Sequence, residues 1–323
     1  TPLTVESRYE GSIRKEYLQL LPKLSLQYDL ARNRGNLYAT VSKGYRSGGY
    51  NVQMFSDLLQ SSLRNDMMRQ SRSAILPQVP EAYRPLVEQF LPEGGENPDA
   101  RSSTIYRPEQ TWNYEIGAHL TLFDGRLHAD AALFWLETRD QQISRFAANG
   151  LGRETTNAGK SRSRGAELAL TAALTSRLTL NASYGYTYAT FRNYVTNEKI
   201  NGELVEISYN GKYVPFVPKH TLNLGGQYLF HLRPGAWLDH LLLSANYTGA
   251  GRIYWTERNN VSQSFYGTLN GRISLQKGQG EINFWVRNIL NKDYATFYFE
   301  SMGNGFVQKS RPIQAGVELR CRF

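Results

Sequence analysis

The last eleven residues alternate strictly between apolar and polar side chains. The odd positions from Ile313 to Phe323 are apolar, and the positions between them carry polar side chains or glycine. A period of two predicts a strand with one apolar and one polar face. A soluble sandwich strand could share this pattern, but about 9–11 residues also cross a bilayer as a tilted strand, and a terminal aromatic suits the girdle at the interface. We therefore predict a membrane strand that closes a barrel, with Phe323 serving barrel assembly at the periplasmic rim.

Similar alternation recurs along the chain and predicts about eleven strands, with a frayed segment before Gly11 counted among them. Short polar links, such as Asp124-Gly125, alternate with longer ones, as in outer-membrane barrels with short periplasmic turns and long outer loops. Bacterial barrels usually have an even strand number. The predicted fold is thus an all-β transmembrane antiparallel barrel, in which this chain supplies about half of roughly 22 strands. The remaining predicted strands cover residues 18–30, 37–45, 109–123, 126–144, 162–174, 178–191, 219–230, 241–254, 265–276 and 281–288.

The polar faces of these strands predict a wet or plugged interior. Asn113, Glu115 and His119 alternate with apolar residues, and so do Asn270, Arg272, Ser274 and Gln276. Such groups are costly in a dry core. Residues 46–107 form one long extracellular loop, with a helical stretch over Asp57–Ile75. We expect this loop either to fold over the vestibule as a ligand-gated lid or to dock a surface partner.

Composition narrows the function classes. The chain has 323 residues, a net charge of +9 and a mean hydropathy of −0.49. Lysine and arginine are scattered singly without a nucleic-acid motif, which excludes nucleic acid as a partner and favours anionic lipopolysaccharide or an anionic ligand. No catalytic constellation, cofactor motif or metal-binding histidine spacing occurs, so we predict neither an enzyme nor a metal site. Lone Cys321 is expected to be a small buried apolar side chain.

Several residues at predicted strand ends are candidates for ligand contact. Tyr45, Arg46 and Tyr50 lie in a glycine-rich segment where a strand enters the longest loop. Tyr and Arg there could instead line the rim or touch a plug. A second group, in a later outer loop, could clamp an anionic aromatic ligand or could simply be girdle aromatics with a surface arginine. The second group is Tyr254, Trp255 and Arg258, and weaker candidates of the same kind are Asn157 and Arg162.

Six blocks together resemble the barrel of TonB-dependent outer-membrane receptors. They are LYATVSKGYRSGGYN (37–51), RPEQTWNYEIG (107–117), LFDGRL (122–127), NAGKSRSRGAELAL (157–170), VRNILNKDYA (286–295) and the terminal RPIQAGVELRCRF.

The resemblance implies that residues 1–323 are the C-terminal part of the barrel, multi-pass in the outer membrane of a Gram-negative bacterium, with the N-terminal plug absent from this sequence. It further implies active uptake of a scarce ligand, most often a ferric siderophore or similar iron chelate, energised by the partner TonB through the plug. Outer-membrane lipid and lipopolysaccharide would surround the barrel, and a surface lipoprotein could cap it. The alternatives are a passive porin, a barrel that anchors a surface-binding protein, and a soluble β-sandwich.

Overall fold

The computed structural model describes residues 13–90, 99–100, 104–146, 153–200, 203–233, 235–301 and 303–322. The chain divides into two compact units. The first contains residues 1–19, 46–109 and 142–157, and the second contains residues 20–45, 110–141 and 158–323. The predicted frayed segment before Gly11 and the terminal Phe323 lie outside the described residues.

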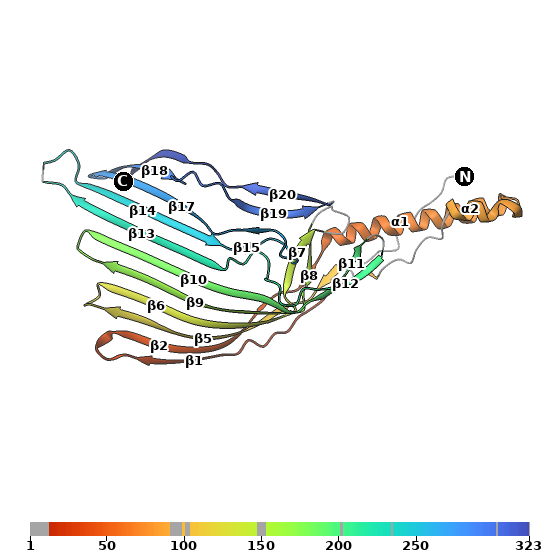
Figure 1. Cartoon of the computed structure of the whole chain (residues 1–323), viewed down its shortest axis with the longest axis horizontal. Helices are drawn as coiled ribbons and strands as arrows, with labels where there is room; N and C mark the ends of the chain where they lie inside the picture. The colour runs from red at the N-terminus through yellow and green to blue at the C-terminus, as the bar shows by residue number, and fades with distance from the viewer. Residues whose placement is uncertain are drawn as a thin grey trace. The chain divides into compact units, whose positions relative to one another are not determined.

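Eleven strands form one antiparallel sheet. Their order in the sheet is the order in which they occur along the chain. This count agrees with the predicted number of about eleven strands, all of which lie within the described residues. Figure 1 shows the strands side by side in chain order. They are β1 (Lys23–Asp29), β2 (Gly35–Arg46), β5 (Glu109–Leu122), β6 (Leu127–Arg139), β9 (Lys160–Ala173), β10 (Leu178–Asn193), β13 (His220–His231), β14 (His240–Gly251), β17 (Tyr266–Lys277), β18 (Gly280–Arg287) and β21 (Gln314–Cys321).

Short turns join alternate pairs of these strands, as predicted from the sequence. The turn between β1 and β2 contains a 3-10 turn at Ala31–Asn33 (η1). Other short turns connect β5 to β6, β9 to β10, β13 to β14 and β17 to β18. In Figure 1 these turns gather at one end of the sheet. The predicted Asp124-Gly125 turn is present, but β5 ends at Leu122 and β6 begins at Leu127, and Asp124 and Gly125 both have positive φ.

The longer connections of the second unit contain small hairpins that the sequence pattern did not predict. The polar segment expected as a loop after β10 forms the pair β11 (Val195–Ile200) and β12 (Glu203–Ser208). Two further pairs are β15 (Ile253–Tyr254) with β16 (Ser262–Gln263), and β19 (Ala295–Ser301) with β20 (Asn304–Lys309). These hairpins are short, with strands of two to seven residues, and so carry less pattern than the strands of the principal sheet.

The first unit contains the predicted helix and two more small strand pairs. Helix α1 spans Val52–Ile75 and so begins five residues before the predicted stretch. The short 3-10 turns η2 (Leu76–Gln78) and η3 (Glu81–Tyr83) follow, and then α2 (Arg84–Phe90). Within the described residues no helix is both long and apolar enough to cross a membrane. The strand pairs are β3 (Gly49–Tyr50) with β4 (Ile105–Tyr106), and β7 (Gln142–Phe146) with β8 (Arg153–Asn157).

Large apolar side chains cover one face of the principal sheet and stay exposed there. Leu133 is 56 % exposed and Val317 is 59 % exposed, whereas the buried apolar residues, such as Phe191 and Trp255, lie at strand ends and in loops. A sheet with so extensive an exposed apolar face must meet a membrane or another protein. We call this surface the apolar face; it includes, one from each strand, Leu26, Leu37, Ile116, Leu133, Leu168, Tyr184, Leu224, Leu243, Ile273, Phe284 and Val317.

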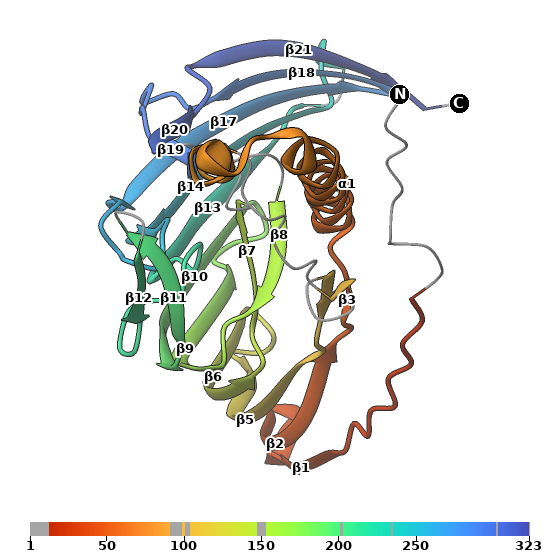
Figure 2. The ribbon, with the colours of Figure 1, turned by 90° about the vertical axis from the view of Figure 1, so that its right-hand side faces the viewer.

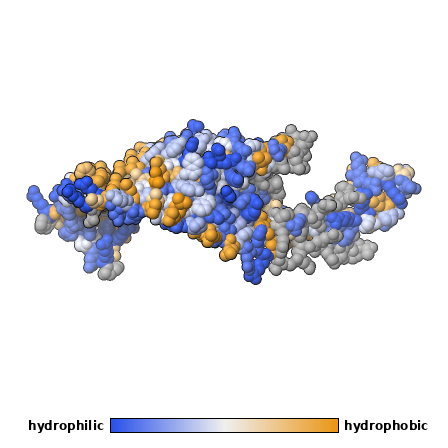
Figure 3. All heavy atoms as spheres, turned by 90° about the horizontal axis from the view of Figure 1, so that it is seen from below, coloured by the Kyte–Doolittle hydropathy of each residue, from blue (hydrophilic) through white to orange (hydrophobic). Residues whose placement is uncertain are grey.

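Strand register carries the apolar face continuously across the sheet. Leu243, Ile273, Phe284 and Val317 are successive cross-strand partners. A shift of one residue in any pair would turn its apolar side chains to the other face. Cys321 shares this face and is exposed, so the expectation that it is buried was wrong. Figure 2 shows that the sheet is curved, and Figure 3 shows apolar side chains reaching the surface along it.

Candidate ligand pathway

The opposite face of the sheet, here called the polar face, carries an acidic cluster near its first strands. The Tyr38 hydroxyl donates to Glu115 Oε1 at 2.7 Å, and its ring stacks on His119 with centroids 5.0 Å apart. His119 Nδ1 lies 2.6 Å from Asp130 Oδ1. Together with Glu167 these residues line a hollow of about 360 Å³. Three carboxyl groups in one hollow suit a cationic group or water rather than a packed core.

Basic and aromatic side chains mark the same face near the last strands. The Arg287 guanidinium lies 5.0 Å from the Trp285 ring centroid. The Glu318 carboxylate forms ion pairs with Arg320, at 2.7 Å, and with Arg272, at 3.7 Å. A second hollow, of about 430 Å³, is lined in part by Arg272, Trp285 and Arg287. The polar face is therefore acidic at one end and basic at the other.

Four asparagine side chains on the polar face each have a buried amide oxygen or nitrogen without a hydrogen-bond partner among the described protein atoms. These atoms are Oδ1 of Asn113, Asn223 and Asn246, and Nδ2 of Asn283. Asn283 is fully buried, and its other amide atom accepts from Ser274. Buried polar groups normally have a partner, so this wall is suited to contact water or polar protein rather than lipid.

Aromatic rings join the outer loops of the second unit. Tyr254 stacks on Tyr213 with centroids 4.9 Å apart, and Phe216 meets Trp255 edge-on at 5.6 Å and stacks on Phe297 at 5.7 Å. Rings at such separations attract one another beyond their buried area. Three loops, around residues 213–216, 254–255 and 297, thus pack together.

Asn259 fixes one of these loops. With φ at +58°, it accepts from the Tyr213 N–H at 2.6 Å and donates to the Tyr213 carbonyl at 3.0 Å. Asparagine tolerates positive φ better than other non-glycine residues. The loop that carries Tyr254 and Arg258 is consequently held in one geometry against its neighbour.

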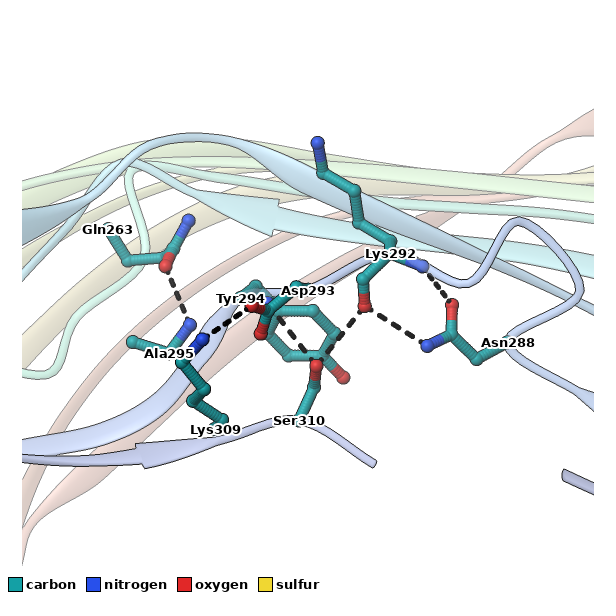
Figure 4. A network of polar contacts seen from close by, with 8 residues as sticks. All are labelled: Gln263, Asn288, Lys292, Asp293, Tyr294, Ala295, Lys309 and Ser310. Atoms are coloured by element: carbon teal, nitrogen blue, oxygen red, sulfur yellow. Dashed lines mark hydrogen bonds and ion pairs between the residues drawn. The ribbon is translucent and has the colours of Figure 1, made fainter. Parts of the chain in front are cut away.

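Asn288 fixes the base of the β19–β20 hairpin, as Figure 4 shows. Its side chain accepts from the Lys292 N–H at 2.8 Å and donates at 3.0 Å to the carbonyls of Lys292 and Arg311. Ser310 Oγ also donates to the Lys292 carbonyl, at 3.1 Å. Gln263 Oε1 accepts from the Ala295 N–H at 2.8 Å, which ties the hairpin to the preceding loop.

An ion pair completes the network in Figure 4, where Lys309 Nζ lies 2.7 Å from Asp293 Oδ2. The hydrogen bond to the Asp293 carboxylate, and then its charge, raise the pKa of Lys309. Lys309 therefore remains charged well above neutral pH. The pair is exposed, so we assign it a positional rather than a stabilising role.

Replacing Asn288 by alanine is expected to release the hairpin. The change removes three side-chain hydrogen bonds and places alanine at a φ of +50°, at a cost of about 2 kcal/mol. Hydrogen exchange of the β19 and β20 amides should accelerate accordingly. Lys292→Gln is the matched control, because only the backbone of Lys292 takes part. Unchanged exchange in Asn288→Ala would show that the hairpin is held by other contacts.

The structure places the predicted ligand-contact residues of the second unit at three different positions. Tyr254 is half-buried against Tyr213, Trp255 is only 8 % exposed, and Arg258 is exposed. Arg162 shares the apolar face with Leu168, and its Nε donates to Glu137 Oε1 at 2.6 Å. Tyr45 lies on the same face as Leu37, at the end of β2 distant from the short turn, and is 47 % exposed.

The predicted residues of the first unit serve its internal structure. Asn157 accepts from the Arg107 N–H at 2.8 Å and donates to its carbonyl at 3.0 Å. Tyr50 pairs with Ile105 between β3 and β4. Arg46 ends β2. Sequence reasoning missed Asn51, which makes the same two-bond contact to the Thr155 backbone at 2.7 and 2.8 Å.

The comparisons with known proteins agree with this architecture. The family model for the TonB dependent receptor-like β-barrel matches residues 3–289, and the chain therefore belongs to that family. TonB-dependent receptor barrels reside in the outer membrane of Gram-negative bacteria and are transport receptors rather than enzymes. The apolar face is consequently the membrane-facing surface, and the short turns are periplasmic.

Individual relatives cover almost all of this chain, whereas the chain covers little more than a third of each. The metal-pseudopaline receptor CntO of Pseudomonas aeruginosa strain PAO1 is 29 % identical over 294 residues, which are 87 % of this chain and 38 % of that protein. The ferric yersiniabactin uptake receptor FyuA of Yersinia pestis has a TM-score of 0.67 at 21 % identity, over 94 % of this chain and 37 % of that one. The siderophore receptor PiuA of Acinetobacter baumannii has a TM-score of 0.61 at 17 % identity, over 92 % and 34 %. The two structures support the fold alone.

Proposed function

We propose that this chain is the C-terminal part of the barrel of an active outer-membrane importer that takes up a metal chelate, with a ferric siderophore as the first candidate. Family membership over residues 3–289 is the observation that carries the proposal. The names of the relatives, which include a metal-pseudopaline receptor and a ferric yersiniabactin receptor, support a chelated metal as cargo. Energy would come from TonB acting on a plug supplied by the rest of the protein.

The polar face supports transport of a ligand with both charged and aromatic parts. Its acidic hollow around Glu115 and its basic wall around Arg272 and Arg287 offer opposite charges within one sheet. Unpartnered asparagine atoms such as Asn246 Oδ1 are groups that a plug or water would satisfy. A passive porin shares the polar face, so energy dependence separates the two functions.

Uptake by the full-length receptor tests the proposed function. The receptor is expressed in a host that lacks its own chelate receptors, and radioactive iron is supplied on hydroxamate, catecholate and mixed-ligand chelators. We expect uptake of at least one chelate, and we expect that uptake to stop when TonB is deleted. Uptake that continues without TonB would instead identify a passive barrel.

For direct ligand contact we propose Tyr254 and Arg258, with Arg46, Tyr50, Asn157 and Trp255 as lesser candidates. Tyr45 and Arg162 lie on the apolar face and are therefore not proposed. The loop of Tyr254 and Arg258 is held in place by Asn259, and Arg258 is exposed. A fixed loop that presents an aromatic ring and a cation can stack on and neutralise an anionic chelate. Both hydrogen-bonding groups of the Asn157 side chain are occupied by Arg107, and Trp255 is buried.

The long loop is proposed as a lid over the vestibule. The side chains of Leu58 and Ser62 on helix α1 are buried, so this part of the loop is folded and is not a random linker. Deleting residues 57–96 from the full receptor should lower chelate uptake at least threefold while leaving barrel assembly intact. Assembly is read from the resistance of the barrel to unfolding in dodecyl sulfate before heating. Unchanged uptake and affinity in an assembled receptor would reject the lid.

A further inference from the structure

Two histidine side chains face each other where β13 and β14 meet their periplasmic turn. His231 ends β13, His240 begins β14, and the two are cross-strand partners. Their Nδ1 atoms lie 3.2 Å apart, and the ring centroids are 5.0 Å apart with the ring planes at 83°. Residues 232–239 separate the two along the chain, so only the register of the hairpin brings the rings together.

Both histidines belong to the polar face. His240 is three positions from Leu243 of the apolar face, and residues at an odd separation along a strand lie on opposite faces. His231 is exposed and His240 is half-buried. The neighbour of His240 in the same cross-strand row is Gln276 of β17. The pair is therefore open to water and to solutes at the periplasmic end of the polar face.

The backbone next to the pair is held in place. The Leu232 N–H donates to the Asp239 carbonyl at 3.2 Å, directly beyond the two histidines. The Asp239 carboxylate accepts from the Gly278 N–H at 2.8 Å and pairs with Lys277 at 2.9 Å, which ties this turn to the turn between β17 and β18. Side chains on strands fixed in this way form a more precise site than side chains on a free loop.

The separation of the two Nδ1 atoms is that of two ligands on one metal ion. Imidazole nitrogens bind zinc at about 2.0–2.1 Å, and two such bonds that meet at about 90–109° place the nitrogens about 2.8–3.4 Å apart. The observed 3.2 Å lies within that range. Without metal, two neutral rings share one proton across this contact. With metal, both rings carry their proton on Nε2 and both Nδ1 lone pairs turn toward the ion, so no proton is lost.

We propose that His231 and His240 together bind a divalent transition metal ion of the copper, nickel or zinc class at the periplasmic end of the polar face. Imidazole suits these ions, whereas magnesium and calcium prefer oxygen ligands. Within the described residues no group of three or more histidine, cysteine or carboxylate side chains could hold a metal ion, so water completes the coordination. Two protein ligands, rather than the four of a structural zinc site, define an exchangeable ion.

The test uses the full-length receptor in detergent, without a polyhistidine tag, and nickel chloride as the only ligand. Nickel binding is measured by titration calorimetry for the wild type, for His231→Gln and for His240→Gln. The control is His128→Gln, because His128 is an exposed histidine of the polar face near another periplasmic turn and its cross-strand partner is Thr121. No chelate and no TonB take part, so the result is independent of the proposed import function.

Wild-type receptor and control should bind nickel alike. Each of the other two variants should bind it at least about tenfold more weakly at one site, since even the outer partners of a metal ligand contribute about 10–100-fold to affinity. Cupric ion should bind the wild-type site more tightly than nickel does, as the Irving–Williams order requires. Equal nickel binding by all four proteins would overturn the proposal.

Hydrogen exchange locates the ion without any substitution. Nickel should slow the exchange of backbone amides over residues 231–240 of the wild-type receptor, because an ion bound across the hairpin stabilises its closed state. This measurement also decides the question if a histidine variant fails to assemble. Exchange in this segment that millimolar nickel leaves unchanged would reject the site.

Discussion

Replacing Leu168 by arginine is expected to destabilise the barrel by about 2–4 kcal/mol and to lower the amount that assembles in the outer membrane. Leu168 is 42 % exposed on the apolar face, between Ala131 and Tyr184 in register. A charged side chain there would have to enter the hydrocarbon layer, which is the most costly position for arginine on a barrel. Unfolding in guanidinium, followed by tryptophan fluorescence, gives the free-energy change.

The matched control is Ala169→Arg on the same strand. Ala169 is on the polar face, and its cross-strand partner is Asp130, which would pair with the new cation. We expect a change within about 0.5 kcal/mol, as for an exposed substitution that breaks no buried contact. The two adjacent positions lie on the same strand but on opposite faces of the sheet. Similar losses for both would contradict the assignment of the faces.

Replacing Gly165 by alanine is expected to cost about 3 kcal/mol, an unusually large effect for one methyl group. A Cβ at Gly165 would lie 2.0 Å from the Tyr186 carbonyl oxygen and 2.5 Å from the Phe134 ring. The ring could turn away, but the carbonyl belongs to a paired strand, so the backbone itself must shift. Guanidinium unfolding of the full receptor measures this loss as well.

Gly44→Ala is the control, since a Cβ at Gly44 would have no neighbouring atom within 4 Å. There the methyl group restricts the unfolded chain without a clash, so stability should be unchanged or slightly higher. A loss at Gly165 no larger than that at Gly44 would show that β9 and β10 are not as closely paired as described.

The principal sheet could be predicted from the sequence because one physical requirement governs it. Each strand must present apolar side chains to lipid and polar ones to the interior, so alternation is strong in β21 and β5 despite the polar average composition. The short periplasmic turns could be predicted for the same reason. Loops without this requirement gave no such signal, which is why the β11–β12 and β19–β20 hairpins were missed.

The candidate ligand contacts were less predictable, because residue type alone does not specify a face. Arg162 was singled out as a basic residue near a loop, yet counting by two from Leu168 places it on the membrane-facing surface. Trp255 was expected to offer a ring to a ligand, but Phe216 packs against it from a loop distant in sequence. The side chains of Asn259 and Asn288 hold neighbouring backbone groups, and both residues have a positive φ. The sequence could have indicated this only through their positions after a strand or in a tight turn.

The measurement that tests the central claim most directly is the accessibility of spin labels along β9 in the full-length receptor, with Cys321 replaced by serine and the protein in lipid bilayers. Labels at Ala166, Leu168 and Leu170 should collide with dissolved oxygen, which concentrates in lipid. Labels at Glu167, Ala169 and Thr171 should collide with a water-soluble nickel complex. The account predicts that accessibility to oxygen and to the nickel complex alternates from residue to residue, with the even-numbered positions facing lipid. No alternation, or alternation in the opposite phase, would contradict a barrel wall with lipid on one face and the ligand pathway on the other.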